Sequence, residues 1–202
     1  MQLWLGAAPL ILASRSAVRH AILAGAGVPH VIKPADIDER MIESRAGAGH
    51  CGEVADLLAR EKAVAVSTRH AGSYVLGADQ TLALGEQRFS KPANAALARK
   101  QLACLRGRTH ELHSAIAVVR DGKVIFQHRE RARLTMREFT DEFLDAYLAA
   151  TGAGATASVG GYQLEGHGIQ LFERIEGDYF VILGLPLLPL LQCLRREGLL
   201  AA

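Results

Sequence analysis

The chain has 202 residues, 50% of them hydrophobic and 22% charged, which is the composition of a globular domain and excludes a disordered chain. A formal net charge of +2 is too small to make nucleic acid or an anionic membrane the main partner. Cys51, Cys104 and Cys193 lack metal-ligand spacing, and neither an export signal nor a long apolar run is apparent, so we expect a cytoplasmic protein with reduced thiols.

The first half of the chain alternates short apolar runs with helical patterns. Ser16 is suited to cap a helix, because its hydroxyl can accept from a free backbone N–H of the first turn. Asp79 closely follows an apolar run and is therefore expected at the C-terminal tip of a strand. The elements predicted for this half are strands at 9–13, 30–33 and 73–76 and helices at 17–26 and 52–66.

The second half contains a strong hairpin signal, the dipeptide Asp121-Gly122 between two apolar runs. Thr140 is expected to cap a helix, and the small residues of 152–161 are expected to form a flexible loop. Alternating strands and helices followed by a hairpin predict a mixed α/β sheet. The predicted elements are helices at 93–105, 139–150 and 187–197 and strands at 112–120, 123–134, 169–172 and 179–183.

Asp79 and Lys91 are the first residues that suggest chemistry. An acid at a strand end of an α/β protein usually lies where ligands bind, although a turn-capping aspartate is the commoner role for such a residue by itself. Lys91 lies in Ser90-Lys91-Pro92, just before a predicted helix. A carboxylate with a separate lysine suits metal-assisted phosphate chemistry, in which the acid holds a divalent ion or orients water and the lysine neutralises phosphate oxygens.

Further polar residues follow the first two predicted strands. Ser14, Ser16 and Arg19 could hold an anion at the start of the first helix, while a serine N-cap is ordinary by itself. Glu39 belongs to a group of acidic residues, with Asp36 and Asp38. Such a group usually lies in a solvated loop, but its carboxylates could also supply oxygen ligands for a divalent ion. Lys62, in the helix predicted at 52–66, could belong to such a site, but a role as an ordinary surface lysine is equally plausible.

The segments that contain these residues also occur in a recognisable order. They are Leu12-Ala13-Ser14-Arg15-Ser16 with Arg19, Asp36-Ile37-Asp38-Glu39, Ala59-Arg60-Glu61-Lys62-Ala63, Gly77-Ala78-Asp79, Ser90-Lys91-Pro92, Leu105-Arg106-Gly107 with His110, Gly160-Gly161-Tyr162 with Glu165-Gly166, Ile175-Glu176-Gly177-Asp178-Tyr179 and Gly184-Leu185-Pro186-Leu187. Together they resemble the Maf family of nucleoside triphosphate pyrophosphatases, named for septum formation, over nearly the whole chain. Ala17 and Val18 depart from the family pattern, which usually has proline at the first position and often arginine or tryptophan at the second.

The resemblance implies a fold like that of inosine triphosphate pyrophosphatases. Residues 1–202 would then form a single α/β catalytic domain, with an elongated mixed β-sheet, flanking helices and a cleft between two lobes. We expect a homodimer that binds a nucleoside triphosphate, and we expect neither nucleic acid nor a membrane as a partner. The implied reaction is the hydrolysis of a nucleoside triphosphate to the monophosphate and diphosphate, by a hydrolase that acts on acid anhydrides.

The same resemblance implies roles for the site residues. Arg19, Lys62 and Lys91 would bind phosphate oxygens, and Asp79 with Glu39 would hold Mg²⁺ or Mn²⁺. Asp79 is also the expected proton acceptor, although a carboxylate with an unshifted pKa near 4 is a poor base at pH 7, so a metal ion would share that role. The expected substrate-binding residues are Ser14, Ser16, Gln80 and Glu165.

Gln80 and Glu165 indicate the branch of the family that hydrolyses 7-methyl-GTP, because a carboxylate can accept from the N1–H and the exocyclic amine of guanine. The branch that acts on dTTP and UTP tends to have Thr and Gln at these positions, and Val18 departs from the 7-methyl-GTP branch. We favour modified guanine and keep dTTP or UTP as the alternative. Two other hypotheses remain: a catalytically weak nucleotide-binding regulator of cell division, and a general phosphatase that releases orthophosphate.

Overall fold

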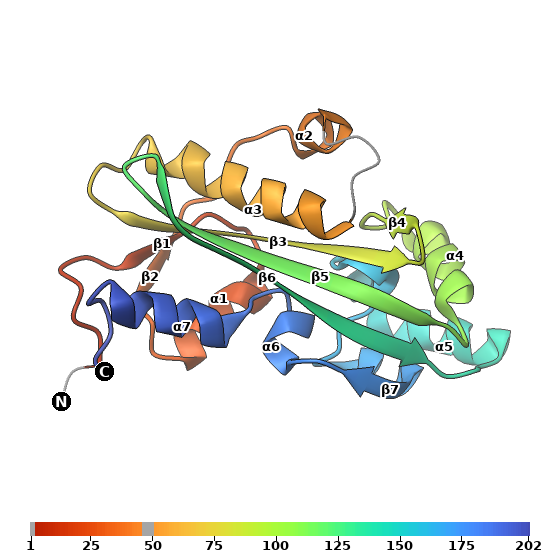
Figure 1. The fold of residues 1–202 in the computed structure, drawn as a ribbon. Helices are drawn as coiled ribbons and strands as arrows, with labels where there is room; N and C mark the ends of the chain where they lie inside the picture. The colour runs from red at the N-terminus through yellow and green to blue at the C-terminus, as the bar shows by residue number, and fades with distance from the viewer. Residues whose placement is uncertain (1–2, 46–50) are drawn as a thin grey trace. The chain divides into compact units, whose positions relative to one another are not determined.

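The computed structural model of the chain describes residues 3–45 and 51–202 and is drawn in Figure 1. The chain divides into two compact units, and each is described by itself. Unit 1 comprises Met1–Asp79, Ser114–Glu130 and Tyr179–Ala202, and unit 2 comprises Gln80–His113 and Arg131–Asp178. The assignment of 1–202 to a single domain of two lobes stays a prediction.

Unit 1 contains parallel strands, part of a hairpin and the longest of the described helices, Cys51–Ser67. Its elements are β1 (Leu10–Leu12), α1 (Ala17–Gly25), β2 (His30–Ile32), α2 (Glu39–Arg45), α3 (Cys51–Ser67), the first part of β3 (Tyr74–Leu84), the last part of β5 (Thr109–Arg120), the first part of β6 (Lys123–Met136), α6 (Tyr179–Ile182) and α7 (Leu187–Arg196).

Unit 2 contains the remainder of β3, β5 and β6. Its other elements are β4 (Gln87–Phe89), α4 (Ala95–Leu105), α5 (Asp141–Thr151), β7 (Phe172–Glu176) and the 3-10 helices η1 (Gly152–Thr156), η2 (Val159–Gly161) and η3 (His167–Leu171).

The described strands form one mixed sheet in the order β2-β1-β3-β5-β6-β7, with β4 paired to β3. β1 pairs in parallel with β2 and β3, whereas β4 on β3 and β7 on β6 are antiparallel. The predicted mixed α/β fold is therefore confirmed. Within the described residues, no helix is long and apolar enough to cross a membrane.

Unit 1 has an apolar layer on each face of its sheet. Leu10 and Leu12 of β1 pack in the layer that also contains residues of α1 and α7, whereas Ile11 and Ala13 pack in the layer that contains α3. Figure 1 shows α1 and α7 on one side of these strands and α3 on the other. Because successive side chains of a strand point to opposite faces, a strand covered on both faces reads as a continuous apolar run, as β1 does.

Helix α3 lies in close contact with β3 at Gly77. A Cβ atom at this position would lie 2.0 Å from the carbonyl oxygen of Ala59 and 2.8 Å from the backbone nitrogen of Ala63. Only glycine fits there without movement of the helix backbone. Asp79 is two residues further along β3 and therefore faces the same helix.

Local signals predicted several boundaries correctly. Ser16 and Thr140 cap α1 and α5 by accepting from the backbone N–H of Arg19 and Phe143. Asp121 and Gly122 have φ angles of 50° and 74°, as the two positive φ values of a type I′ hairpin turn require.

The predicted end of the third strand was wrong. β3 does not stop before Asp79 but continues to Leu84, so Asp79 lies within the strand. The polar sequence Asp79-Gln80-Thr81 looked like a strand end, yet Leu82 and Ala83 beyond it are buried and pair with β4. Tertiary contacts that satisfy the Asp79 carboxylate allow a polar residue inside this strand.

The last third of the chain differs most from the prediction. Residues 179–183, expected as a strand, contain the helical turn α6, and residues 169–172 lie largely in η3, with the strand β7 beginning at Phe172. The expected loop at 152–161 contains η1 and η2, and α2 and β4 had not been predicted. Tertiary packing overrides the strand preference of short segments rich in Val, Ile and aromatic residues.

Candidate active site

Lys62 joins two carboxylates in unit 1. Its ammonium nitrogen Nζ lies 2.6 Å from Oδ1 of Asp79 and 3.0 Å from Oε1 of Glu39. Lys62 and Asp79 are buried, with exposed fractions of 8% and 7%, whereas Glu39 is exposed. Lys62 is therefore not the surface lysine that the sequence left open, and Glu39 belongs to α2 and not to a solvated loop.

Burial controls the acidity of Asp79. The pKa of its carboxyl group is raised from its ordinary value because burial disfavours the charged form, while Lys62 and then Arg19 oppose this shift. A carboxylate with a raised pKa is a better proton acceptor near neutral pH than the unshifted group considered from sequence. Burial thus makes Asp79 a stronger base than an aspartate with the ordinary pKa near 4 would be.

Arg19 is held by three segments of unit 1: the loop after β1, the strand β3 and the turn after α6. Its Nη1 donates to Oγ of Ser14 at 3.1 Å and to the carbonyl oxygen of Ala78 at 2.8 Å, and its Nε donates to the carbonyl oxygen of Gly184 at 2.8 Å. Burial lowers the pKa of Arg19, while the charges of Asp79 and Glu39 raise it. These bonds fix the guanidinium beside the residue that precedes Asp79, which is the place for a fixed positive charge near a polyanionic substrate.

Ser14 and Ser16 shape the turn between β1 and α1. The backbone N–H of Ser16 donates to Oγ of Ser14 at 3.3 Å, and the backbone N–H of Arg19 donates to Oγ of Ser16 at 3.3 Å. Ser14 is buried and also accepts from Arg19. Ser16 thus acts as the helix cap, and a direct contact of either hydroxyl with substrate stays a prediction.

The other predicted site residues belong to unit 2. Gln80 follows Asp79 in β3 and is half-buried. Lys91 is exposed between β4 and α4, and Glu165 is exposed between η2 and η3. Their roles in phosphate binding and base recognition stay predictions.

Asp79 and Glu39 supply carboxylate oxygens, the kind of ligand that a hard divalent cation takes, and their role as metal ligands stays a prediction. Both carboxylates contact the same ammonium nitrogen, so their oxygens gather at one place. Among residues 3–45 and 51–202, no group of three or more His, Cys, Asp or Glu side chains is placed to hold a metal. Two carboxylates match Mg²⁺, which usually keeps several waters and takes further oxygen ligands from substrate phosphates.

Backbone atoms hold the site in a way that could not be predicted from residue types. The carbonyl oxygens of Ala78 and Gly184 accept from Arg19, and Gly77 allows α3 to bring Lys62 to Asp79. The only signal for these positions was the pair of motifs Gly77-Ala78-Asp79 and Gly184-Leu185-Pro186-Leu187. Residue type carries no information on carbonyl acceptors, because every residue has one.

The sheet and this cluster define a mixed α/β protein with a buried acid, ammonium and guanidinium suited to a phosphate-bearing ligand. A family model described as Maf-like protein matches residues 9–197, and the chain belongs to that family. The chain is 55% identical over 201 residues to a protein of Rhodopseudomonas palustris (strain BisB18) named nucleoside triphosphate pyrophosphatase, with 100% of both chains covered.

A second relative carries a more specific name. A protein of Mesorhizobium japonicum named 7-methyl-GTP pyrophosphatase is 52% identical over 191 residues, which cover 94% of this chain and 96% of that protein. Among solved structures, that of a HAM1 protein from Coxiella burnetii has a TM-score of 0.43 and 16% identity, covering 63% of this chain and 72% of the other. That structural likeness is too weak to carry an argument.

Proposed function

We propose that this chain is a nucleoside triphosphate pyrophosphatase, which hydrolyses its substrate to a nucleoside monophosphate and diphosphate. The observation that supports this most is the buried pair of Asp79 and Lys62, with Arg19 hydrogen-bonded to the carbonyl of Ala78 beside it. Membership of the Maf-like family supports the same activity, as does the name of the relative from Rhodopseudomonas palustris.

In the proposed reaction, water attacks the α-phosphorus and the bond from this atom to the oxygen that bridges to the β-phosphate breaks. Asp79 accepts a proton from the water through its carboxylate, and diphosphate leaves with the bridging oxygen. Lys62 contacts only Oδ1 of Asp79 in the hydrogen bonds described, so the second carboxylate oxygen, Oδ2, is the atom we assign to proton transfer. Positioning and charge stabilisation dominate such a reaction.

The positive groups have a complementary role. A triphosphate carries about four negative charges, and Arg19, Lys62 and Lys91 are proposed to neutralise part of this charge. We further propose that Asp79 and Glu39 hold Mg²⁺ or Mn²⁺. When bound, such an ion would neutralise phosphate charge and acidify a coordinated water.

The proposed substrate is 7-methyl-GTP. Glu165 and Gln80 support this choice, since a carboxylate can accept from the donor groups of guanine, and so does the name of the relative from Mesorhizobium japonicum. The alternative is dTTP or UTP, which the departure at Val18 from the 7-methyl-GTP branch leaves open.

A nucleotide panel tests these proposals. The purified chain is incubated with Mg²⁺ or Mn²⁺ and with 7-methyl-GTP, GTP, dTTP, UTP, CTP or ATP, and orthophosphate and diphosphate are detected separately. We expect diphosphate and the monophosphate as products, with the highest kcat/KM on 7-methyl-GTP. Release of orthophosphate would identify a general phosphatase instead, and tight nucleotide binding without turnover would identify a regulator.

A further inference from the structure

A pocket lies in unit 1 at the amino ends of the parallel strands. It has a volume of about 320 Å³, which is within the range of small-molecule sites. Its lining includes Leu10 and Tyr74, the first residues of β1 and β3. Asp79 is five residues further along β3, about 16 Å at the usual rise per residue, so the pocket is separate from the proposed catalytic cluster.

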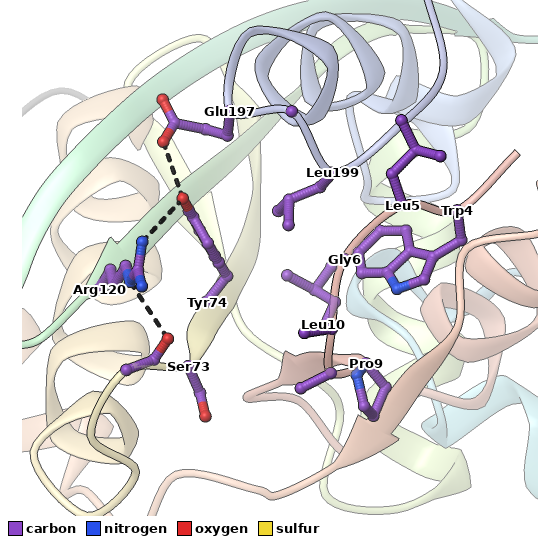
Figure 2. Close-up of a pocket in the computed structure, with 14 residues that line it drawn as sticks. Trp4, Leu5, Gly6, Pro9, Leu10, Ser73, Tyr74, Arg120, Glu197 and Leu199 are labelled. Atoms are coloured by element: carbon purple, nitrogen blue, oxygen red, sulfur yellow. Dashed lines mark hydrogen bonds between the residues drawn. The ribbon is translucent and has the colours of Figure 1, made fainter.

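The two walls of this pocket differ in chemistry. Figure 2 shows Trp4, Leu5, Leu10 and Leu199 on one side, with Tyr74, Arg120 and Glu197 on the other. Trp4, Leu10 and Leu199 are buried parts of the core, whereas Leu5 is 57% exposed. The first wall therefore offers an apolar surface, and Leu5 gains burial if a ligand covers it.

The polar wall is a chain of hydrogen bonds with one charge of each sign. The hydroxyl of Tyr74 donates to Oε2 of Glu197 at 3.0 Å and accepts from Nη1 of Arg120 at 3.2 Å. Burial and the bond to Glu197 raise the pKa of Tyr74, which agrees with a neutral hydroxyl between the two charges. Arg120 and Glu197 thus lie on either side of one oxygen atom.

Arg120 is held in place but keeps donor capacity. Its Nε donates to the carbonyl oxygen of Gly72 at 3.1 Å, its guanidinium carbon lies 4.8 Å from the centre of the Tyr74 ring, and its side chain is 45% exposed. Asp121 approaches Nε at 3.9 Å. A guanidinium has five N–H groups, and the described bonds use one on Gly72 and one on Tyr74.

A ligand for this wall must match both charges. A ligand with only a carboxylate would bind Arg120 but be repelled by Glu197. A ligand with only an amine would bind Glu197 but be repelled by Arg120. A molecule with a carboxylate and an ammonium close together satisfies both, and an apolar side chain on it would cover Leu5 and Leu199. We infer that this pocket binds a free α-amino acid with an apolar side chain, with its carboxylate on Arg120, its ammonium on Glu197 and its side chain on the apolar wall.

L-leucine is the probe for this site, and Trp4 is the reporter because it is the single tryptophan of the chain and lines the pocket. We expect a saturable change in tryptophan fluorescence with a dissociation constant of about 1 mM, since the ligand is small and its ion pairs are solvent-exposed. Saturation-transfer NMR of the ligand provides a second readout. N-acetyl-L-leucine, L-leucinamide and glycine lack the ammonium, the carboxylate and the side chain in turn, and each should bind at least about tenfold more weakly.

Matched variants locate the site. Arg120→Gln and Glu197→Gln should each weaken leucine binding at least about tenfold, whereas Arg69→Gln, the same change at an exposed arginine outside the pocket, should leave it unchanged. Glu197→Gln keeps an acceptor for Tyr74, so it tests the charge even if Arg120→Gln fails to fold. Hydrolysis of nucleoside triphosphates should be unaffected, so this test is independent of the proposed catalytic function.

The inference is overturned by any of three results. The first is no fluorescence change and no saturation transfer with leucine up to about 20 mM, well above the expected dissociation constant. The second is equal binding of N-acetyl-L-leucine or L-leucinamide, which would mean that the paired charges are not recognised. The third is a loss of leucine binding in the control Arg69→Gln as large as that in the folded variants Arg120→Gln and Glu197→Gln, which would mean that the charges of the pocket are not specifically required.

Discussion

At the scale of single residues, Lys62 determines the environment of Asp79. Its ammonium contacts Asp79 and Glu39 together, and the buried Arg19 adds a second positive charge that lowers the pKa of Asp79. Buried charges persist only when they are paired. The cluster therefore holds a carboxylate in a dry environment, where its basicity exceeds that of an exposed aspartate.

Asp79→Asn keeps the shape of the side chain but removes its charge. Turnover should fall by about a hundredfold or more, because the proton acceptor and a proposed metal ligand are lost together. Folding should survive because Lys62 retains Glu39 as a partner at 3.0 Å. Diphosphate release and a thermal melt measure the two effects.

The control for this variant is Asp145→Asn, the same change at an exposed carboxylate paired with Arg99. It should leave turnover within about twofold, since exposed ion pairs contribute little. An Asp79→Asn enzyme that turns over normally in the presence of EDTA would refute both the role of Asp79 and the metal requirement.

Lys62→Met should change the pH profile as well as the rate. Lys62 lowers the pKa of Asp79, so its removal raises that pKa further and leaves less of the carboxylate in its charged form at low pH. The acidic limb of kcat/KM against pH should therefore move to higher pH, while Lys100→Met, at an exposed lysine, leaves it in place. A limb that stays or moves to lower pH contradicts this account.

At the scale of elements, the contact between α3 and β3 brings Lys62 to Asp79. Gly77 permits this contact, because a Cβ atom there would meet the carbonyl oxygen of Ala59 at 2.0 Å. On the side of α3, the layer at this contact includes the small residues Ala55, Ala59 and Ala63. Small residues on a helix let its backbone approach a strand closely, so this layer sets how near Lys62 lies to the sheet.

Gly77→Ala should push α3 away from β3. We expect a loss of about 1–3 kcal/mol in the free energy of unfolding and a fall in activity, because the obstructing atom is backbone. Gly25→Ala is the matched control: Gly25 lies in α1 with nothing within 4 Å of an added Cβ, so stability should stay the same or rise by about 0.5–1 kcal/mol. Urea denaturation measures both, and equal stabilities of the two variants would disprove the close contact.

His110 of β5 gives unit 2 a dependence on pH. Its Nε2 lies 2.7 Å from the hydroxyl oxygen of Tyr162, and burial lowers its pKa to about 4. Between pH 6.5 and 4 the unfolded histidine takes up a proton while the folded one stays neutral. The unfolded state then binds more protons, so this residue lowers the free energy of unfolding as the pH falls, by up to about 3 kcal/mol.

Removal of His110 should reduce that dependence. In His110→Asn the decline of unfolding free energy from pH 6.5 to 4 should be shallower than in His167→Asn, in which the exposed histidine is changed. Urea unfolding at several pH values measures these slopes, and identical slopes would contradict the assigned pKa.

At the scale of the whole molecule, the proposed function uses residues from both units. Asp79, Lys62 and Arg19 belong to unit 1, whereas Lys91 and Glu165 belong to unit 2. The acid–lysine pair thus lies in unit 1, whereas the residues proposed to choose the base, Gln80 and Glu165, lie in unit 2 together with the proposed phosphate ligand Lys91. A change at Glu165 is therefore expected to alter substrate preference without a change in the acid–lysine pair.

Glu165→Gln is the corresponding specificity test. The change replaces one acceptor oxygen of the carboxylate with an N–H donor, so one donor group of guanine loses its hydrogen-bond acceptor. Substrate preference should therefore move towards pyrimidine nucleotides. Turnover on the best pyrimidine should be kept or improved, and Gln80→Thr in the same background should extend the shift. A wild-type enzyme that prefers dTTP or UTP to 7-methyl-GTP would end the guanine proposal and leave the hydrolysis of nucleoside triphosphates intact.

The site could be predicted from sequence only in part. Motif order predicted Asp79, Lys62, Arg19 and Glu39 as residues of one site, and the structure brings these four together in unit 1, while their catalytic roles stay predictions. Their pairing was not predicted, because residues 17 positions apart in the sequence, such as Lys62 and Asp79, give no local sign of contact.

Features that depend on near neighbours could be read from the sequence alone: the caps at Ser16 and Thr140, the Asp121-Gly122 turn and the strand β1. Side-chain size and backbone preference act over a few residues, so these features can be read locally. Contacts with distant parts of the chain, and not local preference, make β3 continue through Asp79 and make residues 179–182 helical. Burial against distant elements outweighs local preference there, since a strand that pairs with its neighbours can tolerate a polar residue once a buried lysine pairs with it.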